Sequence, residues 1–518
     1  MKIKQKYIYL FAFVAVAFIM LPAMNGDYLY TIQENQVFIS GHTFMVDIIE
    51  HEGGWLAWMA CYLTQFFYYP WLGSAIIIAL WSIIYLLTIH LFQIKGKLTP
   101  IALFLPLLLL FNLLDYGYWI YYAKTPGFPF QPTLLASFFL LCTQLVLPLL
   151  KRFKWCPRHG IILPISLCCI ILAISATTIW KPQHRNFLTN HKSSILVTLT
   201  DKNFRHEMKM YRALDEFKFE DVINEIHACK EEPTRLMVLY KNIALMHTNR
   251  IKDIFKTNNN GIRSNASNEL NVKTSLLGAP LAYYHFGLFN FSYRWAMENS
   301  VQYGQSFRNL KMLARCAIMN HEFDVAIKYI SLLKASSFHR DWAKEREAWI
   351  ASSTLLAQSK EFQTIAALPN TEFPNHLDGD DGLCEKYIIS FLKSFSESNQ
   401  VHSPFLEDIA ICIALWHKET YAFCVHFYDY VNNHPNEPIP TLYQEGAILL
   451  GTDESSPITL DRFKFDVPVA NKYNQFVRDY NQLQQAGIDH EEMGKRLKGI
   501  YGDTYWWYYY FCLDLNFY

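Results

Sequence analysis

The sequence has no excess of charge, because 46 Lys/Arg residues balance 46 Asp/Glu residues. It has no basic stripe, so nucleic acid is not an expected partner. It also lacks Walker A, GxSxG, HExxH and dinucleotide-binding glycine motifs, so none of these catalytic classes is indicated. The eleven cysteines include no CxxC pair and no His/Cys ligand spacing. We therefore expect no cofactor and no metal site, and most thiols to be buried as small hydrophobic side chains.

Charge is also absent from the stretch 161–180, IILPISLCCIILAISATTIW. Its length matches the roughly 20 apolar residues that a helix needs to cross a bilayer. The residues before it are largely apolar and aromatic, whereas those after it are of mixed composition, with 36 Lys/Arg and 40 Asp/Glu. The sequence therefore predicts a transmembrane domain at 1–180 and an exported helical-repeat domain at 181–518.

Other apolar runs precede this stretch. The first follows Lys2, Lys4 and Lys6 and is either a signal peptide or a membrane helix. Because the following LPAMNG has no clean small-x-small cleavage site, an uncleaved helix is favoured. The expected membrane spans are five, at 7–24, 72–92, 101–118, 132–150 and 161–180.

The distribution of basic residues agrees with five spans. Nine Lys/Arg then lie on the inner side and only Lys124 lies in the outer connections, as the positive-inside rule requires. The segment 55–69, WLAWMACYLTQFFYY, is short, and counting it as a sixth span would reverse the bias. We expect it to be an interfacial helix. Five spans place 181–518 in the periplasm, outside the inner membrane of a bacterium.

Helical periodicity follows in the exported part, most clearly in 307–335. Its first helix has Leu310, Leu313, Ala314 and Ala317 on one face, and a turn at 320–321 leads into EFDVAIKYISLL. The pair resembles a tetratricopeptide repeat, whose second helix opens with an aromatic residue, an acid and an alanine. Looser copies lie at 217–226, 288–297, 360–368 and 419–427.

These observations predict an all-α fold, with a bundle of about five transmembrane helices followed by a tetratricopeptide-like α-solenoid. In the clearest repeat, Ala314 and Ala326 are expected to face each other where the two helices cross, because a small side chain permits close helix axes.

The acidic residues of the membrane part all fall on the outer side in this topology. A carboxylate there can act as a general base or hold a metal ion, and Asp115 is of first interest because an acid within a span is costly. The simpler interpretation is that exported loops are polar and poor in Lys/Arg, so that acids collect in them. The six acids are Asp27, Glu34, Asp47, Glu50, Glu52 and Asp115.

The string Glu52-Gly53-Gly54-Trp55, followed by LTQFFYYPWLGS, is the most distinctive in the chain. Together with YGDTYWWYYYF at 501–511, it resembles an uncharacterised multipass membrane family of Bacteroidota, which joins a short membrane bundle to a helical exported domain. That resemblance implies an architecture and no activity. The rings of Tyr505, Trp506 and Trp507 form either a packed terminal helix or an exposed platform for a glycan or a peptide.

The membrane half is also similar to multipass glycosyltransferases that use polyprenyl-phosphate-linked sugars. That resemblance implies Asp27 or Asp47 as a base and Glu34 as a possible metal ligand. If the protein is an enzyme, Asp115 is a further catalytic candidate because of its place within a span. The chain departs from that fold in having fewer spans and no acid pair after the first helix.

The interpretation that we carry forward is a membrane scaffold. We expect its periplasmic domain to bind another envelope protein or a glycan, and its membrane part to contact the lipid bilayer. Glu34, Glu52, Trp55 and the terminal aromatic residues are the candidate binding residues. The alternative is an enzyme that acts on a polyprenyl-phosphate-linked sugar at the outer leaflet.

Overall fold

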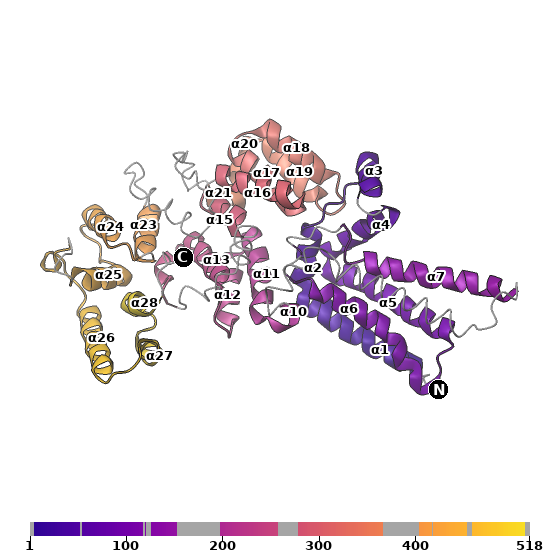
Figure 1. The fold of residues 1–518 in the computed structure, drawn as a ribbon. Coiled ribbons are helices and arrows are strands. Elements are labelled where there is room, and N and C mark those ends of the chain that lie inside the picture. The colour runs from indigo at the N-terminus through magenta and orange to yellow at the C-terminus, as the bar shows by residue number, and fades with distance from the viewer. Residues whose placement is uncertain are drawn as a thin grey trace. The chain divides into compact units, whose positions relative to one another are not determined.

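The protein is helical throughout the part of the chain that the structure describes. The computed structural model describes residues 5–51, 54–117, 120, 126–152, 197–256, 278–287, 289–365, 404–416, 418–452 and 458–512. These residues form α-, 3-10 and π-helices and no strand (Figure 1). The expectation of an all-α fold is confirmed.

The chain divides into two compact units that interleave in sequence. The first comprises Met1–Met208 and Phe289–Gln363, and the second comprises Lys209–Leu288 and Thr364–Tyr518. This division differs from the predicted domain boundary at residue 180, because 289–363 belongs to the same unit as the apolar N-terminal helices.

The first unit contains three helices that are long and apolar enough to cross a membrane: Gln5–Glu34, Pro70–Phe92 and Gly96–Asp115. They match the spans predicted at 7–24, 72–92 and 101–118. The predicted span 132–150 falls in α7, whose shorter apolar part is Gln131–Leu145, and the span 161–180 lies outside the described residues. The described residues therefore give three membrane-length helices where the sequence predicted five spans in the whole chain. The elements are α1 (Gln5–Phe18), η1 (Ile19–Ala23), α2 (Met24–Glu34), α5 (Pro70–Phe92), η3 (Gly96–Leu103), α6 (Phe104–Asp115) and α7 (Gln131–Arg152).

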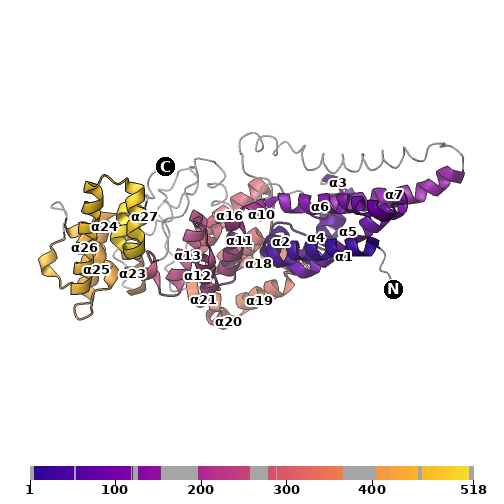
Figure 2. The same ribbon diagram turned by 90° about the horizontal axis from the view of Figure 1, so that it is seen from below.

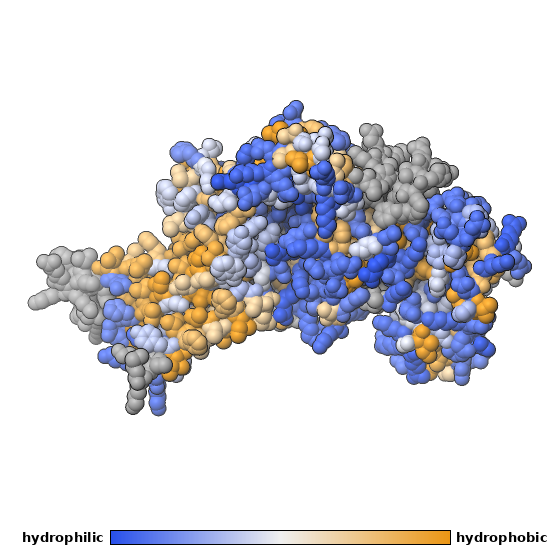
Figure 3. Space-filling view, turned by 180° about the vertical axis from the view of Figure 1, so that it is seen from behind, coloured by the Kyte–Doolittle hydropathy of each residue, from blue (hydrophilic) through white to orange (hydrophobic). Residues whose placement is uncertain are grey.

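Helices α1, α5, α6 and α7 run side by side as a bundle (Figures 1 and 2). Near one end of the bundle, the Tyr85 hydroxyl of α5 donates a hydrogen bond to the Lys6 carbonyl, at 3.0 Å. At the other end, the Tyr28 hydroxyl of α2 donates to the Leu113 carbonyl of α6, at 2.9 Å. Apolar side chains cover the outside of the bundle, at the left of Figure 3. Such a surface is stable against lipid and unfavourable against water.

Two short helices connect α2 to α5. They are α3 (His42–His51) and α4 (Gly54–Thr64), and α4 continues into the 3-10 helix η2 (Gln65–Tyr68). With a rise of about 1.5 Å per residue, α4 is far shorter than the roughly 30 Å hydrocarbon core. It packs on α3 through a small buried cluster of Phe38, Ile48, Ala57 and Cys61.

The C-terminal part of the first unit is a run of antiparallel helices. Ser306 caps the start of α17, where its hydroxyl accepts a hydrogen bond from the Asn309 amide at 3.1 Å. Ala314 and Ala326 are both fully buried in one hydrophobic cluster, as the predicted register requires. The helices are α16 (Phe289–Tyr303), α17 (Phe307–Met319), α18 (Phe323–Lys334), α19 (Arg340–Ala351), α20 (Ser353–Gln358) and α21 (Lys360–Ile365), and α10 (Val197–Thr200) also belongs to this unit.

The second unit is built from helices alone in its described part. They are most of α11 (Lys202–Asp215), α12 (Phe219–Ala228), α13 (Arg235–His247), η5 (Ile251–Asp253), α15 (Ala279–His285), α23 (Pro404–Trp416), α24 (Thr420–Asn433), α25 (Thr441–Gly451), η7 (Leu460–Arg462), α26 (Val467–Gln485), α27 (His490–Tyr501) and α28 (Tyr505–Phe511).

Three hairpins share one turn: α11–α12, α17–α18 and α23–α24. In each, a residue with left-handed backbone follows the first helix, namely Phe217, His321 and Lys418, with φ of 57°, 60° and 57°. The amide of the next residue then bonds the carbonyl of an alanine five residues earlier. These bonds run from Lys218 to Ala213, from Glu322 to Ala317 and from Glu419 to Ala414, at 2.8, 2.8 and 2.9 Å. This Schellman geometry satisfies carbonyls at the helix end and reverses the chain.

Candidate functional site

The first membrane-length helix ends in four consecutive buried polar residues. Gln33, Glu34, Asn35 and Gln36 are 0%, 5%, 1% and 7% exposed. The helix from Gln5 to Glu34 has 30 residues, or about 45 Å at 1.5 Å per residue. Because the hydrocarbon core of a bilayer is about 30 Å thick, a helix of this length exceeds it by roughly ten residues. The polar run is therefore buried by protein and not by lipid.

A kink separates this extension from the rest of the helix. Pro22 lies in the π-helical turn η1, and Asn25 has non-helical backbone angles (φ −125°, ψ 30°). The Asn25 side-chain amide donates to the Met20 carbonyl at 2.7 Å, which compensates a backbone bond that the distortion removes. Near the point where the helix leaves the hydrocarbon, its direction can therefore change.

An ion pair joins the end of α2 to α17. The Lys311 ammonium lies 2.6 Å from Glu34 Oε2, and the side chains of Lys311 and Glu34 are 7% and 6% exposed. Glu34 Oε1 lies 3.6 Å from His339 Nε2, a residue of the α18–α19 turn. Each buried charge needs the other, because removing either would leave an uncompensated ion away from water.

His339 is neutral in this environment. Its pKa is lowered to about 4, chiefly by burial; the Glu34 carboxylate acts in the opposite direction, and the Lys311 charge adds to the lowering. The side-chain amide of Gln33 lies 2.9 Å from His339 Nε2. An amide nitrogen can only donate, so Nε2 accepts and the proton of the neutral ring sits on Nδ1.

The same polar run contacts η2 and the chain before α7. The Gln33 amide donates to Gln65 Oε1 at 3.1 Å, and the Gln65 amide donates to the Gln36 carbonyl at 3.2 Å. Gln36 Oε1 accepts the backbone amide of Gly127 at 2.9 Å. Gly127 has φ of 65°, and a Cβ there would lie 2.4 Å from Ala60 Cβ, so only glycine fits this approach.

Aromatic rings pack beside this polar network. Phe338, in the α18–α19 turn, contacts Phe66, Tyr68 and Tyr69 with ring centroids 5.7, 5.5 and 5.9 Å apart. The Ser40 amide also bonds the Ala335 carbonyl, at 3.3 Å. We call the whole set the junction: Gln33, Glu34, Gln36, Gln65, Lys311, Phe338 and His339. It fixes the α17–α19 helices to the end of the first membrane-length helix.

A second buried charge cluster lies within the same unit. Arg346 Nη2 donates a hydrogen bond to Glu361 Oε2 at 2.8 Å, Arg315 Nε forms an ion pair with Glu361 Oε1 at 3.1 Å, and all three side chains are buried. The Arg346 guanidinium lies 4.3 Å from the ring centroids of both Trp342 and Trp349. One carboxylate thus holds three helices together: α17, α19 and α21.

The metal-ligand role implied for Glu34 is not supported, because the Lys311 ammonium occupies the position of a cation. The described residues contain no group of three or more His, Cys, Asp or Glu side chains that could hold a metal ion. Asp27 begins α2 and Asp115 ends α6, at the same end of the bundle, and both are half-buried, whereas Asp47 is exposed on α3. Glu52 lies outside the described residues.

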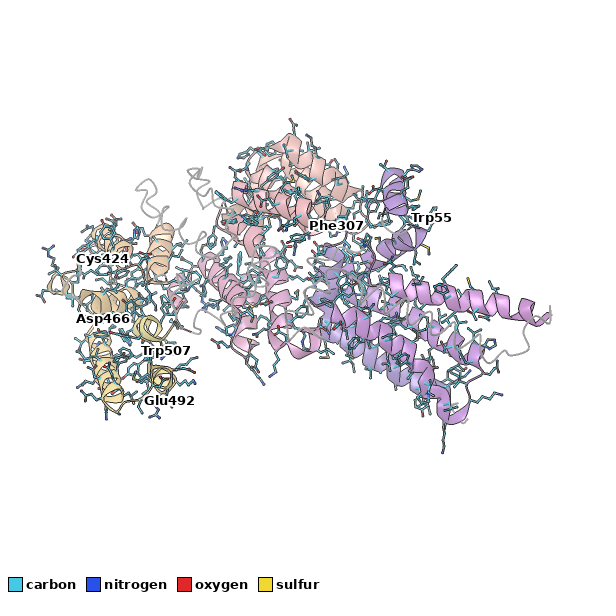
Figure 4. All side chains as sticks on the ribbon, in the orientation of Figure 1. Trp55, Phe307, Cys424, Asp466, Glu492 and Trp507 are labelled. Atoms are coloured by element: carbon cyan, nitrogen blue, oxygen red, sulfur yellow. The ribbon has the colours of Figure 1, made fainter. Side chains whose placement is uncertain are left out.

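The terminal aromatic residues are packed and do not form an exposed platform. Tyr505, Trp506 and Trp507 are 0%, 0% and 6% exposed. The Trp507 indole donates to the Gly494 carbonyl at 3.0 Å, and the Tyr505 amide donates to Glu445 Oε2 at 2.8 Å. These rings are therefore core residues, which corrects their assignment as a binding surface. Trp55, by contrast, is 60% exposed at the start of α4 (Figure 4).

Sequence reasoning named Glu34 as a candidate but missed Lys311 and His339 as its neighbours. A signal for Lys311 was present, since it lies with Arg315 one helical turn apart in the otherwise apolar LKMLARCAIM. Two cations within an apolar helix require buried partners.

Fold and junction together describe a class of protein: helices of membrane length joined through a buried polar contact to helical hairpins. The chain belongs to the family described as "Family of unknown function (DUF6057)", whose model matches residues 2–125 and 119–512. Comparison with curated proteins and with solved structures finds no match. The expected membership of an uncharacterised family along nearly the whole chain is thus shown, while Bacteroidota and glycosyltransferases find no support in these comparisons.

Proposed function

We propose that the protein is an integral inner-membrane scaffold of a bacterium, whose periplasmic helical repeats bind another envelope protein or a glycan. The junction is the observation that carries the proposal. A binding surface keeps a defined orientation relative to the membrane only if it is rigidly attached to the membrane helices. The buried Glu34–Lys311 ion pair provides such an attachment between α2 and α17.

The repeat character of the exported part adds support. Hairpins α11–α12, α17–α18 and α23–α24 reverse the chain through the same Schellman turn, as the hairpins of a degenerate tetratricopeptide-like array could, although α5, α13 and α26 also end in this common turn. Such arrays bury one face against their neighbours and leave another for ligands. A continuous solenoid through 181–518 is part of this proposal, and fold analogy is its warrant.

The proposed topology has five spans with the C-terminus in the periplasm. Lys6 and Tyr85 lie at the same end of the bundle, because successive helices run in opposite directions. Lys95 and Lys97 follow α5 shortly after Tyr85 in the sequence and therefore lie near this end as well. A phosphatase reporter fused at Tyr518 should then be active, and a cytoplasmic reporter at the same site should be silent. The reverse pattern would contradict the proposed topology.

The test of binding is affinity capture of the full chain from detergent-solubilised membranes of its own cells after cross-linking. A scaffold should retain a defined protein or glycan, which in turn should capture the tagged chain. The comparison variant is Lys311→Met, which removes the buried ion pair between α2 and α17. It should reduce capture without removing any exposed side chain. If neither wild type nor variant retains a component, the scaffold proposal is contradicted.

The glycosyltransferase-like enzyme remains the alternative, and the outer acids separate the two functions. Asp27→Asn, Asp47→Asn and Asp115→Asn should each leave capture intact in a scaffold. An enzyme of this kind should instead lose turnover of a polyprenyl-phosphate-linked sugar with at least one of them.

A further inference from the structure

Helix α4 has an exposed hydrophobic face. Trp55, Met59 and Tyr62 are 60%, 48% and 43% exposed, and their spacing of four and then three residues places them on one side of the helix. The same character continues at Tyr69 and Trp71, which are 47% and 60% exposed. We call these five residues the α4 stripe.

The opposite face of α4 is fully used by the protein. Ala57 and Cys61 are buried against Phe38 and Ile48, and Ala60 lies against Gly127. The Phe38 ring also contacts the Tyr62 ring, with centroids 5.4 Å apart, and so holds one residue of the stripe in place. Because this face is packed, α4 cannot rotate to bury the stripe inside the protein.

Water is an unfavourable neighbour for this face. Residues 54–71 contain no Asp, Glu, Lys or Arg. A helix exposed to water ordinarily presents charged or polar side chains on its outer face. Removal of each exposed apolar side chain here from water would be favourable. The stripe therefore requires a covering medium.

The position of α4 in the chain identifies that medium. Only η2 and Tyr69 separate α4 from Pro70, where the 23-residue apolar helix α5 begins. At about 2 Å per residue of 3-10 helix, the end of α4 lies within roughly 10 Å of the point where α5 enters the bilayer. Trp and Tyr side chains favour this headgroup level, since their rings are apolar and their N–H and O–H groups are polar.

We propose that the α4 stripe lies in the headgroup region of the leaflet that α5 enters, with lipid as its occupant. Helix α4 then lies along the membrane surface, its packed face toward the protein and its stripe toward the acyl chains. Helix η2 directly follows α4 and carries Gln65 of the junction, together with Tyr68, whose ring stacks on Phe338. The contact between the α4 stripe and lipid therefore sets the height of the junction above the membrane. The assignment does not depend on what the exported repeats bind.

Photocross-linking in the full-length protein tests the proposal. Trp55, Met59 and Tyr62 are each replaced by p-benzoylphenylalanine, in native membranes that contain an alkyne-tagged phospholipid. Phe104, which is 53% exposed on α6, is the positive control, and Tyr421, which is 75% exposed on α24, is the negative control. The stripe positions should give lipid adducts at about the Phe104 yield, roughly tenfold above Tyr421, because lipid surrounds only residues at bilayer depth.

The outcomes are distinct. Lipid adducts at all three stripe positions support the proposal. Adducts to a protein, whether a second copy or a different chain, or a yield no higher than at Tyr421 while Phe104 reacts, overturn it. Three separate exposed positions guard against misfolding of one variant, and each variant is first required to elute as wild type in size-exclusion chromatography. A lipid result with no captured partner would leave this inference standing while the scaffold proposal fails.

Discussion

The hairpins α17–α18 and α23–α24 share the same turn, yet different chemistry stabilises them. Helix α17 places two buried cations, Lys311 and Arg315, against the carboxylates of Glu34 and Glu361. Helix α24 instead packs through aromatic side chains, with Phe423 and Phe427 fully buried. One turn geometry thus accepts either a charged or an aromatic surrounding.

The difference teaches how each hairpin can be used. A buried ion pair tolerates only one partner at one distance, so it fixes α17 to a particular place on α2. Aromatic burial is large but non-directional, and it forms a core without selecting a single contact. Hairpin α17–α18, with its buried ion pairs, is therefore suited to attachment at one defined position. Hairpin α23–α24, with its buried aromatic rings, is suited to forming a hydrophobic core.

The largest effect is expected for Glu361→Ala. This change removes the buried carboxylate that the guanidinium groups of Arg315 and Arg346 share, which should cost about 3–5 kcal/mol of unfolding free energy. Denaturant unfolding of the detergent-solubilised chain, followed by tryptophan fluorescence, measures it. The control is Glu347→Ala, an exposed acid that pairs with Lys334 and should change stability by no more than about 1 kcal/mol. Equal effects of the two variants would show that buried charge does not distinguish this hairpin.

Lys311→Met should have the next largest effect, about 3 kcal/mol, because Glu34 stays buried without its partner. Adding Glu34→Gln removes the stranded charge, so the double variant should be more stable than Lys311→Met alone. Amide hydrogen exchange should localise the damage to the end of α2 and to α17. Strictly additive losses would mean that the pair does not couple the two helices.

Ala326→Leu should cost about 1–3 kcal/mol, because a larger side chain overpacks the α17–α18 contact. The full chain is the object of this measurement, since 289–363 packs in one unit with the apolar N-terminal helices. Neighbouring Ile327 is 43% exposed, and Ile327→Leu should change the melting temperature little. A wild-type melting temperature for Ala326→Leu would refute the repeat register.

Glu445→Gln tests the aromatic region through pH. Burial raises the pKa of Glu445 to about 7, against an ordinary value of 4.5. Between these values the folded state binds more protons than the unfolded state, so wild-type stability falls as pH rises from 4.5 to 7. The variant stays neutral and keeps an acceptor for the Tyr505 amide. It should match wild type near pH 4 and exceed it by about 1–3 kcal/mol at pH 8.

Unfolding free energies of both proteins at these two pH values measure the effect. Burial lowers the pKa of His247, in the same unit, to about 4, so its protonation destabilises the folded state as the pH falls. This effect is the same in wild type and variant and cancels from the difference between their unfolding free energies. A pH-independent difference would contradict the assignment of Glu445 as a carboxyl with a raised pKa.

Much of the helical pattern followed from the sequence. Apolar runs at 72–92 and 101–118 correspond to Pro70–Phe92 and Gly96–Asp115, because backbone hydrogen bonds within a long apolar segment leave little alternative to a helix. The burial of Ala314 and Ala326 also followed, since the helical period places them on the apolar face. The first helix was expected to end at residue 24 but continues to Glu34, and its polar extension is covered by protein.

The candidate site was less predictable. Glu34 was a candidate as one of six acids of the membrane part and through the resemblance to glycosyltransferases, but nothing in the sequence pairs it with Lys311, which lies far along the chain. The terminal rings of 505–507 left both a packed terminal helix and an exposed platform open, since aromatic residues suit both an interior and a binding surface. Only their surroundings in the fold make them core residues.

The sequence by itself determined the positions of the helices, the apolar character of the N-terminal bundle and the small residues of the clearest hairpin. These features depend on neighbours within about one or two turns, where periodicity and backbone hydrogen bonding act. The tertiary structure alone decided which acid meets which base, and that 289–363 forms one unit with the N-terminal helices, apart from 209–288 and 364–518. Those choices depend on contacts between residues distant in sequence, whose free energy exists only once the helices have packed.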